Sequence, residues 1–223
     1  LSAEHLRRVR RERPERFDEV FEPCVANILE QVEELQKTAA EFSSFYRVPN
    51  LDRRPVDLEK TVRGVVDGYR HADSVEVSWQ GNESADPRPL VVLHDERQVA
   101  RIVRNLIENS IAACQRGGRD GHVEVGCRRH GGWAVVEVVD DGVGVPEGDG
   151  EVERIFEPNF STKSGGTGLG LAISRRIAEQ HGGTLRAFRN EGRGLRTVLR
   201  LPLGSTGRPT PGNSRGEVAA EDR

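Results

Sequence analysis

A glycine-rich stretch that runs directly into a helical pattern constrains the fold of this chain more than any other feature. Four glycines fall within residues 165–170, and apolar residues recur four apart at Leu169, Ile173 and Ile177, the spacing of an amphipathic helix. Glycine lacks a Cβ, so this backbone can approach a ligand closely. A helix N-terminus also presents unpaired N–H groups and a positive dipole end to an anion. The stretch predicts a phosphate-binding loop or, alternatively, an ordinary connection between two elements.

A second pattern lies near the start of the chain. In residues 21–46, apolar side chains alternate four and three apart, which predicts a long helix with an apolar seam. One helix cannot bury such a seam alone. Residues 1–13 are typical of the end of a preceding helix that breaks near Pro14, so we expect a helical hairpin that dimerises into a four-helix bundle. The alternative is a helix that packs on its own domain. Pro23 marks either a kink or the first turn of the long helix.

Helix and strand patterns alternate after a proline-bounded break at residues 49–55, which we expect to be a linker. Asp57 and Asp95 each precede a helical pattern and are expected to be N-cap residues. Short strands are expected between these helices, at residues 75–80 and 90–93. The helix after Asp95 should run to about residue 115. Its expected buried face consists of Val99, Ile102, Val103, Leu106, Ile107 and Ile111.

Two asparagines lie on that second helix. Asn105 and Asn109 are four residues apart, so they share one face, away from most of the apolar stripe. Asparagine is a mediocre helix former, so two in one helix need a reason. A role facing a ligand and a simple surface placement both remain open at this point.

Residues 133–139 form the most apolar strand pattern and are expected to pair with residues 123–130 in a hairpin. The strand ends in Asp140, followed by Gly142 and Gly144. An aspartate at the end of a central strand, followed by Gly-x-Gly, places a carboxylate at a cleft rim beside exposed backbone. A simple turn is the competing interpretation. A closing hairpin is expected at residues 184–201.

Composition excludes several classes of function. The formal charge is −3 with both signs mixed along the chain, which argues against a nucleic-acid-binding surface. No apolar run approaches the roughly 20 residues that span a bilayer. The three cysteines lie far apart without metal-ligand spacing, which fits a reducing compartment. The chain contains no methionine and begins with Leu1, so we expect it to be a fragment of a longer protein.

The order of these motifs resembles the ATP-binding domain of sensor histidine kinases, in the GHKL superfamily with its Bergerat fold. Residues 104–109 resemble the N box, residues 140–144 the G1 box, residues 155–160 the F box and residues 166–171 the G2 box. The resemblance continues through residues 173–183, which look like the kinases rather than the gyrase or chaperone branches. Residues 33–46 resemble the second dimerisation helix of nitrogen-regulation-type sensor kinases.

This resemblance implies an α/β two-layer sandwich preceded by a dimerising helical hairpin. The implied domains are a partial hairpin at residues 1–48, a linker at residues 49–55 and an ATP-binding catalytic domain at residues 56–203. Residues 204–223 are polar and aperiodic, and we expect them to be disordered.

The resemblance also implies roles for individual residues. Asp140 would accept a hydrogen bond from the adenine amine, where guanine carries a carbonyl oxygen. Asn109 would offer its side-chain oxygen to Mg²⁺, and Asn105 would face the phosphates or a metal-bound water. The backbone at Gly142 and Gly144 would pass close to the nucleotide. The residues expected around the phosphates are Lys163, Gly166, Thr167, Gly168, Leu169 and Gly170; Lys163 is equally well explained as an exposed lid lysine. His181 receives no catalytic role.

One feature of the kinases is missing. They phosphorylate a histidine in a His-Glu-x-Lys/Arg-Asn-Pro type motif, and no such motif occurs here; His5 lacks both the acid and the proline. We therefore expect a chain that begins after the acceptor histidine and does not phosphorylate itself productively. No general base is assigned, because Glu108 is a candidate only by proximity and is expected to face solvent.

The expected function is the catalytic part of a two-component sensor histidine kinase. It would bind Mg·ATP and transfer the γ-phosphate to a histidine, for relay to an aspartate of a response-regulator receiver domain. The alternatives are a non-catalytic, nucleotide-responsive dimerisation module, or another GHKL ATPase or serine kinase. The expected partners are a second copy, bound through the hairpin, and the receiver domain, with no nucleic acid. The expected location is cytoplasmic, with a membrane anchor only through upstream segments.

Overall fold

The computed structural model describes residues 2–46, 51–70, 75–81, 88–118, 120–146, 148, 150–160, 167–190 and 192–203. Lys163, Gly166 and the expected tail at residues 204–223 lie outside this range, as do residues 47–50. The chain divides into two compact units. One comprises Leu1–Leu51 and Val145–Arg176, and the other comprises Asp52–Gly144 and Ile177–Arg223.

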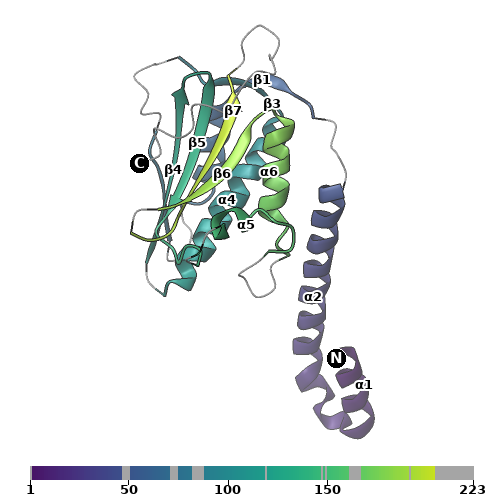
Figure 1. The fold of residues 1–223 in the computed structure, drawn as a ribbon. Helices are drawn as coiled ribbons and strands as arrows, with labels where there is room; N and C mark the ends of the chain where they lie inside the picture. Colours follow the sequence, from purple (N-terminus) through teal and green to yellow (C-terminus); the bar gives the residue numbers. More distant parts are fainter. Residues whose placement is uncertain are drawn as a thin grey trace. The chain divides into compact units, whose positions relative to one another are not determined.

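The second unit is built on a five-stranded mixed sheet (Figure 1). In their order across the sheet, the strands are β2 (Val75–Trp79), β4 (Gly121–His130), β5 (Trp133–Asp140), β7 (Leu195–Pro202) and β6 (Thr184–Arg189). β2 runs parallel to β4, and the other neighbours are antiparallel. β5 is the middle strand, as its apolar sequence predicted. A separate antiparallel pair joins β1 (Arg54–Asp57), which begins inside the expected linker, to β3 (Val91–His94).

Helices form the second layer of this unit. α3 (Leu58–Asp67) and α4 (Glu96–Arg116) pack against each other, and α4 lies against β4 and β5 (Figure 1). Both predicted N-caps are confirmed, because the Asp57 carboxylate accepts from Glu59 N–H at 3.2 Å and the Asp95 carboxylate from Gln98 N–H at 3.2 Å. Each cap satisfies one backbone donor that the first turn of a helix would leave unpaired. The α/β sandwich that the sequence predicted is present.

The core of this unit lies between α4 and the sheet. Five of the six residues expected on the buried face of α4 are at most 1% exposed, but Ile111 is only half-buried. Ser110 takes its place in the interior. With 3.6 residues per turn, the buried stripe drifts around the helix from Leu106 and Ile107 to Ser110, Ala113 and Cys114. The expected position of Ile111 was therefore wrong, and a hydroxyl lies inside the core instead.

The N-terminal helices belong to the other unit. α1 (Ser2–Glu12), a 3₁₀ turn (Pro14–Arg16) and α2 (Phe17–Tyr46) follow one another, and α1 contacts α2. α2 begins four residues earlier than expected, so Pro23 lies inside the helix rather than in its first turn. No helix among the described residues combines the length and apolar character that a bilayer crossing requires.

The same unit contains the segment before and around the glycine-rich stretch. α5 (Glu151–Arg154) is a single short helical turn. A helix follows the glycine-rich stretch, as the sequence predicted. This helix, α6 (Gly170–Gln180), begins one residue after Leu169 and continues into the sheet-containing unit.

Candidate functional site

Asp140, the last residue of the middle strand β5, carries a buried carboxylate, and only 3% of the residue is exposed. Three protein groups donate to it. The Ser110 hydroxyl reaches Oδ2 at 2.9 Å, and the N–H groups of Gly142 and Leu195 reach Oδ1 at 3.0 Å and 3.2 Å. Burial raises the pKa of this carboxyl above its ordinary value, and the three hydrogen bonds oppose the rise because they favour the ionised form.

The loop after Asp140 passes within contact distance of α4. A Cβ at Gly142 would lie 2.6 Å from the carbonyl carbon of Ala113, so only glycine fits there. Val143 N–H donates to the same Ala113 carbonyl at 3.2 Å. The space beside Gly142 is thus filled by α4, which gives this glycine a packing role that needs no ligand.

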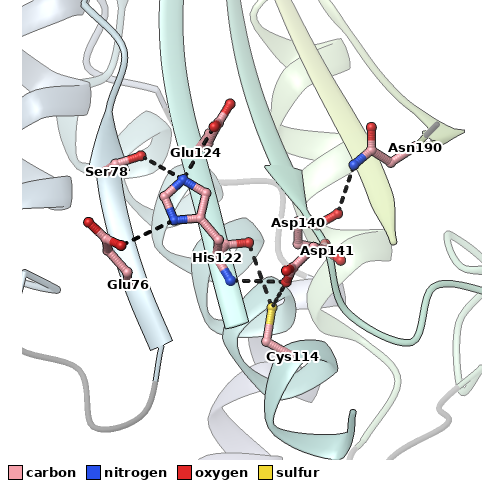
Figure 2. A network of polar contacts seen from close by, with 8 residues as sticks. All are labelled: Glu76, Ser78, Cys114, His122, Glu124, Asp140, Asp141 and Asn190. Atoms are coloured by element: carbon pink, nitrogen blue, oxygen red, sulfur yellow. Dashed lines mark hydrogen bonds and ion pairs between the residues drawn. The ribbon is translucent and has the colours of Figure 1, made fainter. Parts of the chain in front are cut away.

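The turn between β6 and β7 closes over Asp140 from the other side. The Asn190 side chain donates to the Asp140 carbonyl at 3.1 Å (Figure 2). A Cβ at Gly194 would overlap that same carbonyl oxygen. Gly144 also approaches this turn, since a Cβ there would lie 3.1 Å from the Gly194 carbonyl oxygen. Sequence reasoning missed Asn190, Gly194 and Leu195, because their link to Asp140 exists only in the folded sheet.

Asp141 has a different role from its neighbour. Its Oδ1 accepts from the His122 backbone N–H at 2.9 Å and from the Cys114 thiol at 3.4 Å (Figure 2). Burial raises the pKa of Cys114 to about 12, and the hydrogen bond to Asp141 adds to the rise. The thiol therefore stays protonated at neutral pH and is a donor rather than a nucleophile. Asp141 ties the end of β5 to β4 and α4.

The predicted pair Asn105 and Asn109 lies on α4, and both residues are half-buried. Asn109 Nδ2 lies 3.5 Å from Asn105 Oδ1, at the outer limit of a hydrogen bond. Asn109 directly precedes Ser110 in the helix, so the structure places this pair beside the residue that bonds Asp140. Sequence reasoning passed over Ser110, although a hydroxyl within a buried helical stripe was a signal that it had a polar partner.

The donor set on α4 suits one kind of cation. Amide oxygens are hard ligands of the type that Mg²⁺ accepts, but they carry no charge. No group of three His, Cys, Asp or Glu residues that could hold a metal occurs in the part of the chain that the structure describes. Because they are uncharged, the amide oxygens of Asn105 and Asn109 fit a cation that arrives with its own anionic ligands.

The glycine-rich stretch lies in the other unit, and its described part is Thr167, Gly168, Leu169 and Gly170. The Thr167 hydroxyl accepts from Leu169 N–H at 3.4 Å. Gly168 has φ +65°, and a Cβ there would lie 2.6 Å from the carbonyl carbon of Asn159. This glycine is therefore required for the loop to pack against the residues before it, including Asn159, which itself has φ 66°.

Two arginines hold the F-box segment in that unit. The Arg175 guanidinium lies 4.4 Å from the centroid of the Phe156 ring and pairs with Glu153 at 2.8 Å. Arg154 lies 5.2 Å from the centroid of the Phe160 ring. Cations over aromatic faces contribute about 0.5–1 kcal/mol each at exposed sites. These contacts order the segment that leads into the glycine-rich stretch.

His181 and Glu108 both have hydrogen-bond partners within the protein. His181 is 4% exposed; its Nδ1 donates to the Ile177 carbonyl at 2.8 Å, and its Nε2 accepts from Asp95 N–H at 3.0 Å. Burial lowers the pKa of His181 and keeps the ring neutral. Glu108 is exposed and accepts from the Tyr69 hydroxyl at 2.8 Å.

Comparison with known proteins gives consistent matches. Residues 94–205 match the family described as histidine kinase-, DNA gyrase B-, and HSP90-like ATPase. The chain is 32% identical to the nitrogen regulation protein NtrY of Azorhizobium caulinodans over 212 residues, which cover 93% of this chain and 26% of NtrY. The chain therefore spans only about a quarter of the length of that relative.

Two solved structures are also similar. The catalytic domain of the histidine kinase ThkA matches with a TM-score of 0.58 and 26% identity, over 68% of this chain and 96% of that one. Full-length ShkA in complex with AMPPNP matches with a TM-score of 0.63 and 25% identity, over 89% of this chain and 40% of that one.

Proposed function

The chain belongs to the histidine kinase-, DNA gyrase B- and HSP90-like ATPase family, and we propose that it is the catalytic, ATP-binding part of a two-component sensor histidine kinase. The observation that carries the proposal is the buried Asp140 carboxylate at the end of β5, next to the helix that presents Asn105 and Asn109. Burying a carboxylate costs free energy unless hydrogen-bond donors compensate it; three protein groups donate to Asp140, and a ligand would supply a further donor.

Asp140 would recognise the adenine base. A carboxylate offers about four lone-pair directions, and three protein donors take three of them. The remaining direction fits one donor, such as the exocyclic amine of adenine. Guanine presents a carbonyl oxygen at that position, so it would be repelled and would offer no proton. This geometry supports ATP rather than GTP as the nucleotide.

The phosphate end of the nucleotide would involve both asparagines and the glycine-rich stretch. Asn109 would offer its amide oxygen to Mg²⁺, whose other ligands would be phosphate oxygens and water, and Asn105 would face the phosphates or such a water. Backbone N–H groups at Gly166, Gly168 and Gly170, with Thr167 and Leu169, would bind phosphate oxygens ahead of α6. Lys163 is assigned to the γ-phosphate.

Catalysis at such a site would rest on positioning and on electrostatic stabilisation of the phosphoryl group in transfer. The γ-phosphate would pass to the imidazole of a histidine and then to an aspartate of a response-regulator receiver domain. The printed sequence contains no acceptor motif of the expected kind. We therefore propose that this chain phosphorylates a histidine supplied in trans and does not phosphorylate His5.

The same proposal covers the organisation of the protein. Residues 1–48 would dimerise as a helical hairpin, residues 49–55 would connect it, and residues 56–203 would bind ATP. The partners would be a second copy of the chain and the receiver domain. The site would lie in the cytoplasm, where ATP is available, and any membrane anchor would belong to upstream segments.

Phosphotransfer in trans tests the proposal. The chain is incubated with Mg²⁺, γ-labelled ATP and a separate four-helix-bundle domain that carries an intact acceptor histidine. We expect acid-labile, base-stable label on the bundle domain, none on His5, and loss of labelling when Mg²⁺ is chelated. The matched control is a bundle domain with the acceptor histidine replaced by glutamine. ATP binding without any labelling of the bundle would contradict the kinase proposal and favour the nucleotide-responsive module.

A further inference from the structure

We propose that Ser110 is a positioning residue for base recognition, because it fixes the Asp140 carboxylate so that a single acceptor direction on Oδ2 faces the ligand. The role deepens the proposed function and rests on it. Ser110 would not touch the base. It would instead determine how strongly the site distinguishes a purine that bears an exocyclic amine from one that lacks it.

Ser110 is placed for this role by α4. The residue is 4% exposed and lies in the buried stripe of the helix. Its hydroxyl reaches Asp140 Oδ2 at 2.9 Å, within the range of a well-formed O–H···O bond. A helical serine in a dry environment usually donates to the carbonyl four residues earlier. Here the Ser110 hydroxyl donates instead to the Asp140 carboxylate at the end of β5.

The acceptor count explains why this hydroxyl matters. Both hydrogen bonds from backbone N–H groups go to Oδ1, from Gly142 and Leu195. Within the described parts of the chain, Oδ2 accepts a hydrogen bond from the Ser110 hydroxyl alone. With Ser110 present, Oδ2 has one lone pair left, in a fixed direction. Without it, Oδ2 has two open lone pairs, and a water molecule can enter the space of the missing hydroxyl and take either of them.

The neighbouring polar groups do not provide a substitute. The Cys114 thiol lies one turn further along α4, but it donates to Asp141 Oδ1 rather than to Asp140 (Figure 2). The Asn190 amide donates to the backbone carbonyl of Asp140, not to its carboxylate. Ser110 is thus the one side chain, among the described contacts, that orients the oxygen assigned to the base.

The test compares two ligands and four proteins by calorimetric titration of the full 223-residue chain. The ligands are Mg·ATP and the Mg²⁺ complex of purine riboside triphosphate, which lacks the exocyclic amine. The proteins are the wild type, Ser110→Ala, Ser110→Thr and Thr197→Val. Thr197 is the matched control, because its buried hydroxyl donates to the Val138 carbonyl at 3.3 Å and does not contact the Asp140 carboxylate.

We expect Ser110→Ala to weaken ATP binding about tenfold, because a carboxylate that Ser110 no longer holds in place loses most of the charge-assisted hydrogen bond from the adenine amine. Binding of the purine analogue should change less than about twofold, because it makes no hydrogen bond to Oδ2. Ser110→Thr should restore ATP binding, and Thr197→Val should leave both ligands unaffected.

Three results would overturn the role of Ser110. The first is wild-type ATP affinity in Ser110→Ala. The second is an equal loss for both ligands in Ser110→Ala, and the third is the same loss in Thr197→Val, since either of these would mean general structural damage. Failure of the wild type to bind ATP at all would instead overturn the proposed function, and the role of Ser110 with it.

Discussion

At the scale of single residues, the end of β5 buries a carboxylate, a group that is normally hydrated. Asp140 carries a charge in a place where water barely reaches it, and the protein compensates with one hydroxyl and two backbone donors. Gly142 and Gly194 then let α4 and the β6–β7 turn close around it, because neither position has room for a Cβ. The Asp140 carboxylate is thereby enclosed by α4 on one side and by the β6–β7 turn on the other.

The charge of Asp140 should reduce the stability of the fold. Burial raises the pKa of the Asp140 carboxyl, so the folded state loses this proton at a higher pH than the unfolded state. The free energy of unfolding therefore decreases as the pH rises from the pKa of the unfolded state through that of the folded state. Asp140→Asn removes the charge. Its Oδ1 can keep both N–H bonds, and its Nδ2 can donate to Ser110 Oγ, which also accepts. We expect an unchanged or higher melting temperature at pH 7 together with loss of ATP binding. A fall of more than about 2 kcal/mol in the free energy of unfolding would instead show that the ionised group stabilises the fold.

The two glycines of the β6–β7 turn allow a matched comparison. Gly192 and Gly194 both have positive φ, +84° and +92°, so alanine at either position meets backbone strain of about 1–2 kcal/mol. Only the Cβ at Gly194 would also overlap the Asp140 carbonyl, whereas that at Gly192 has nothing within 4 Å. We expect Gly194→Ala to lose at least about 2 kcal/mol more than Gly192→Ala in urea unfolding. Equal losses would mean that the turn closes less tightly on β5.

At the scale of helices and strands, the features that could be predicted are those encoded locally. Asp57 and Asp95 were identified as caps because a cap depends on the few residues that follow it. The middle strand was identified because Ala134–Val139 is almost entirely apolar, and a strand of this composition is expected to be buried on both faces. Ile111 was misplaced because the buried stripe drifts around α4 with the 3.6-residue period of the helix, and Ser110 was missed because its partner, Asp140, lies on β5. Asn190 and Leu195 could not be linked to Asp140, since strand register across β5 and β7 brings them together.

The junction of α4, α6 and the small sheet should make stability depend on pH. His181 and His94 are both buried, and burial lowers the pKa of each. Below pH of about 6.5 the unfolded state therefore binds more protons than the folded state, and stability falls as pH decreases, by up to about 1.4 kcal/mol per pH unit for each histidine. We expect urea unfolding between pH 5 and 7.5 to show this slope. His181→Gln should flatten it, and the exposed His130→Gln should not. An identical slope in all three proteins would assign the effect to other groups.

At the scale of the whole molecule, the apolar seam of α2 has several side chains exposed to solvent. Leu35 is 68% exposed, Val32 42% and Phe21 40%, on a helix of 30 residues. Exposed apolar residues at heptad spacing favour association of helices, which supports the proposed homodimer. In the sequence, the heptad periodicity of α2 was the only feature that indicated a dimer, because the contacts of a second copy are not encoded in any other local pattern.

A charge placed on the seam tests the dimer. We expect the wild type to sediment as a dimer at micromolar concentration and Leu35→Glu to shift it toward monomer by at least about tenfold in dissociation constant, since a buried unpaired carboxylate is strongly disfavoured. The control is Glu33→Gln, which changes an exposed residue off the seam. ATP binding should be unaffected in both. A monomeric wild type, or a Leu35→Glu protein that stays dimeric, would exclude the seam as the interface.

The most direct measurement is a pair of calorimetric titrations of the wild-type chain, with Mg·ATP and with Mg·GTP. One carboxylate that accepts from the adenine amine and repels the guanine carbonyl should favour ATP by at least about 100-fold, or roughly 2.7 kcal/mol. We expect saturable 1:1 binding of ATP per chain and no measurable binding of GTP at the same concentrations. Equal affinity for the two nucleotides, or no binding of ATP, would contradict the assignment of Asp140 as the base-recognising residue of an ATP site.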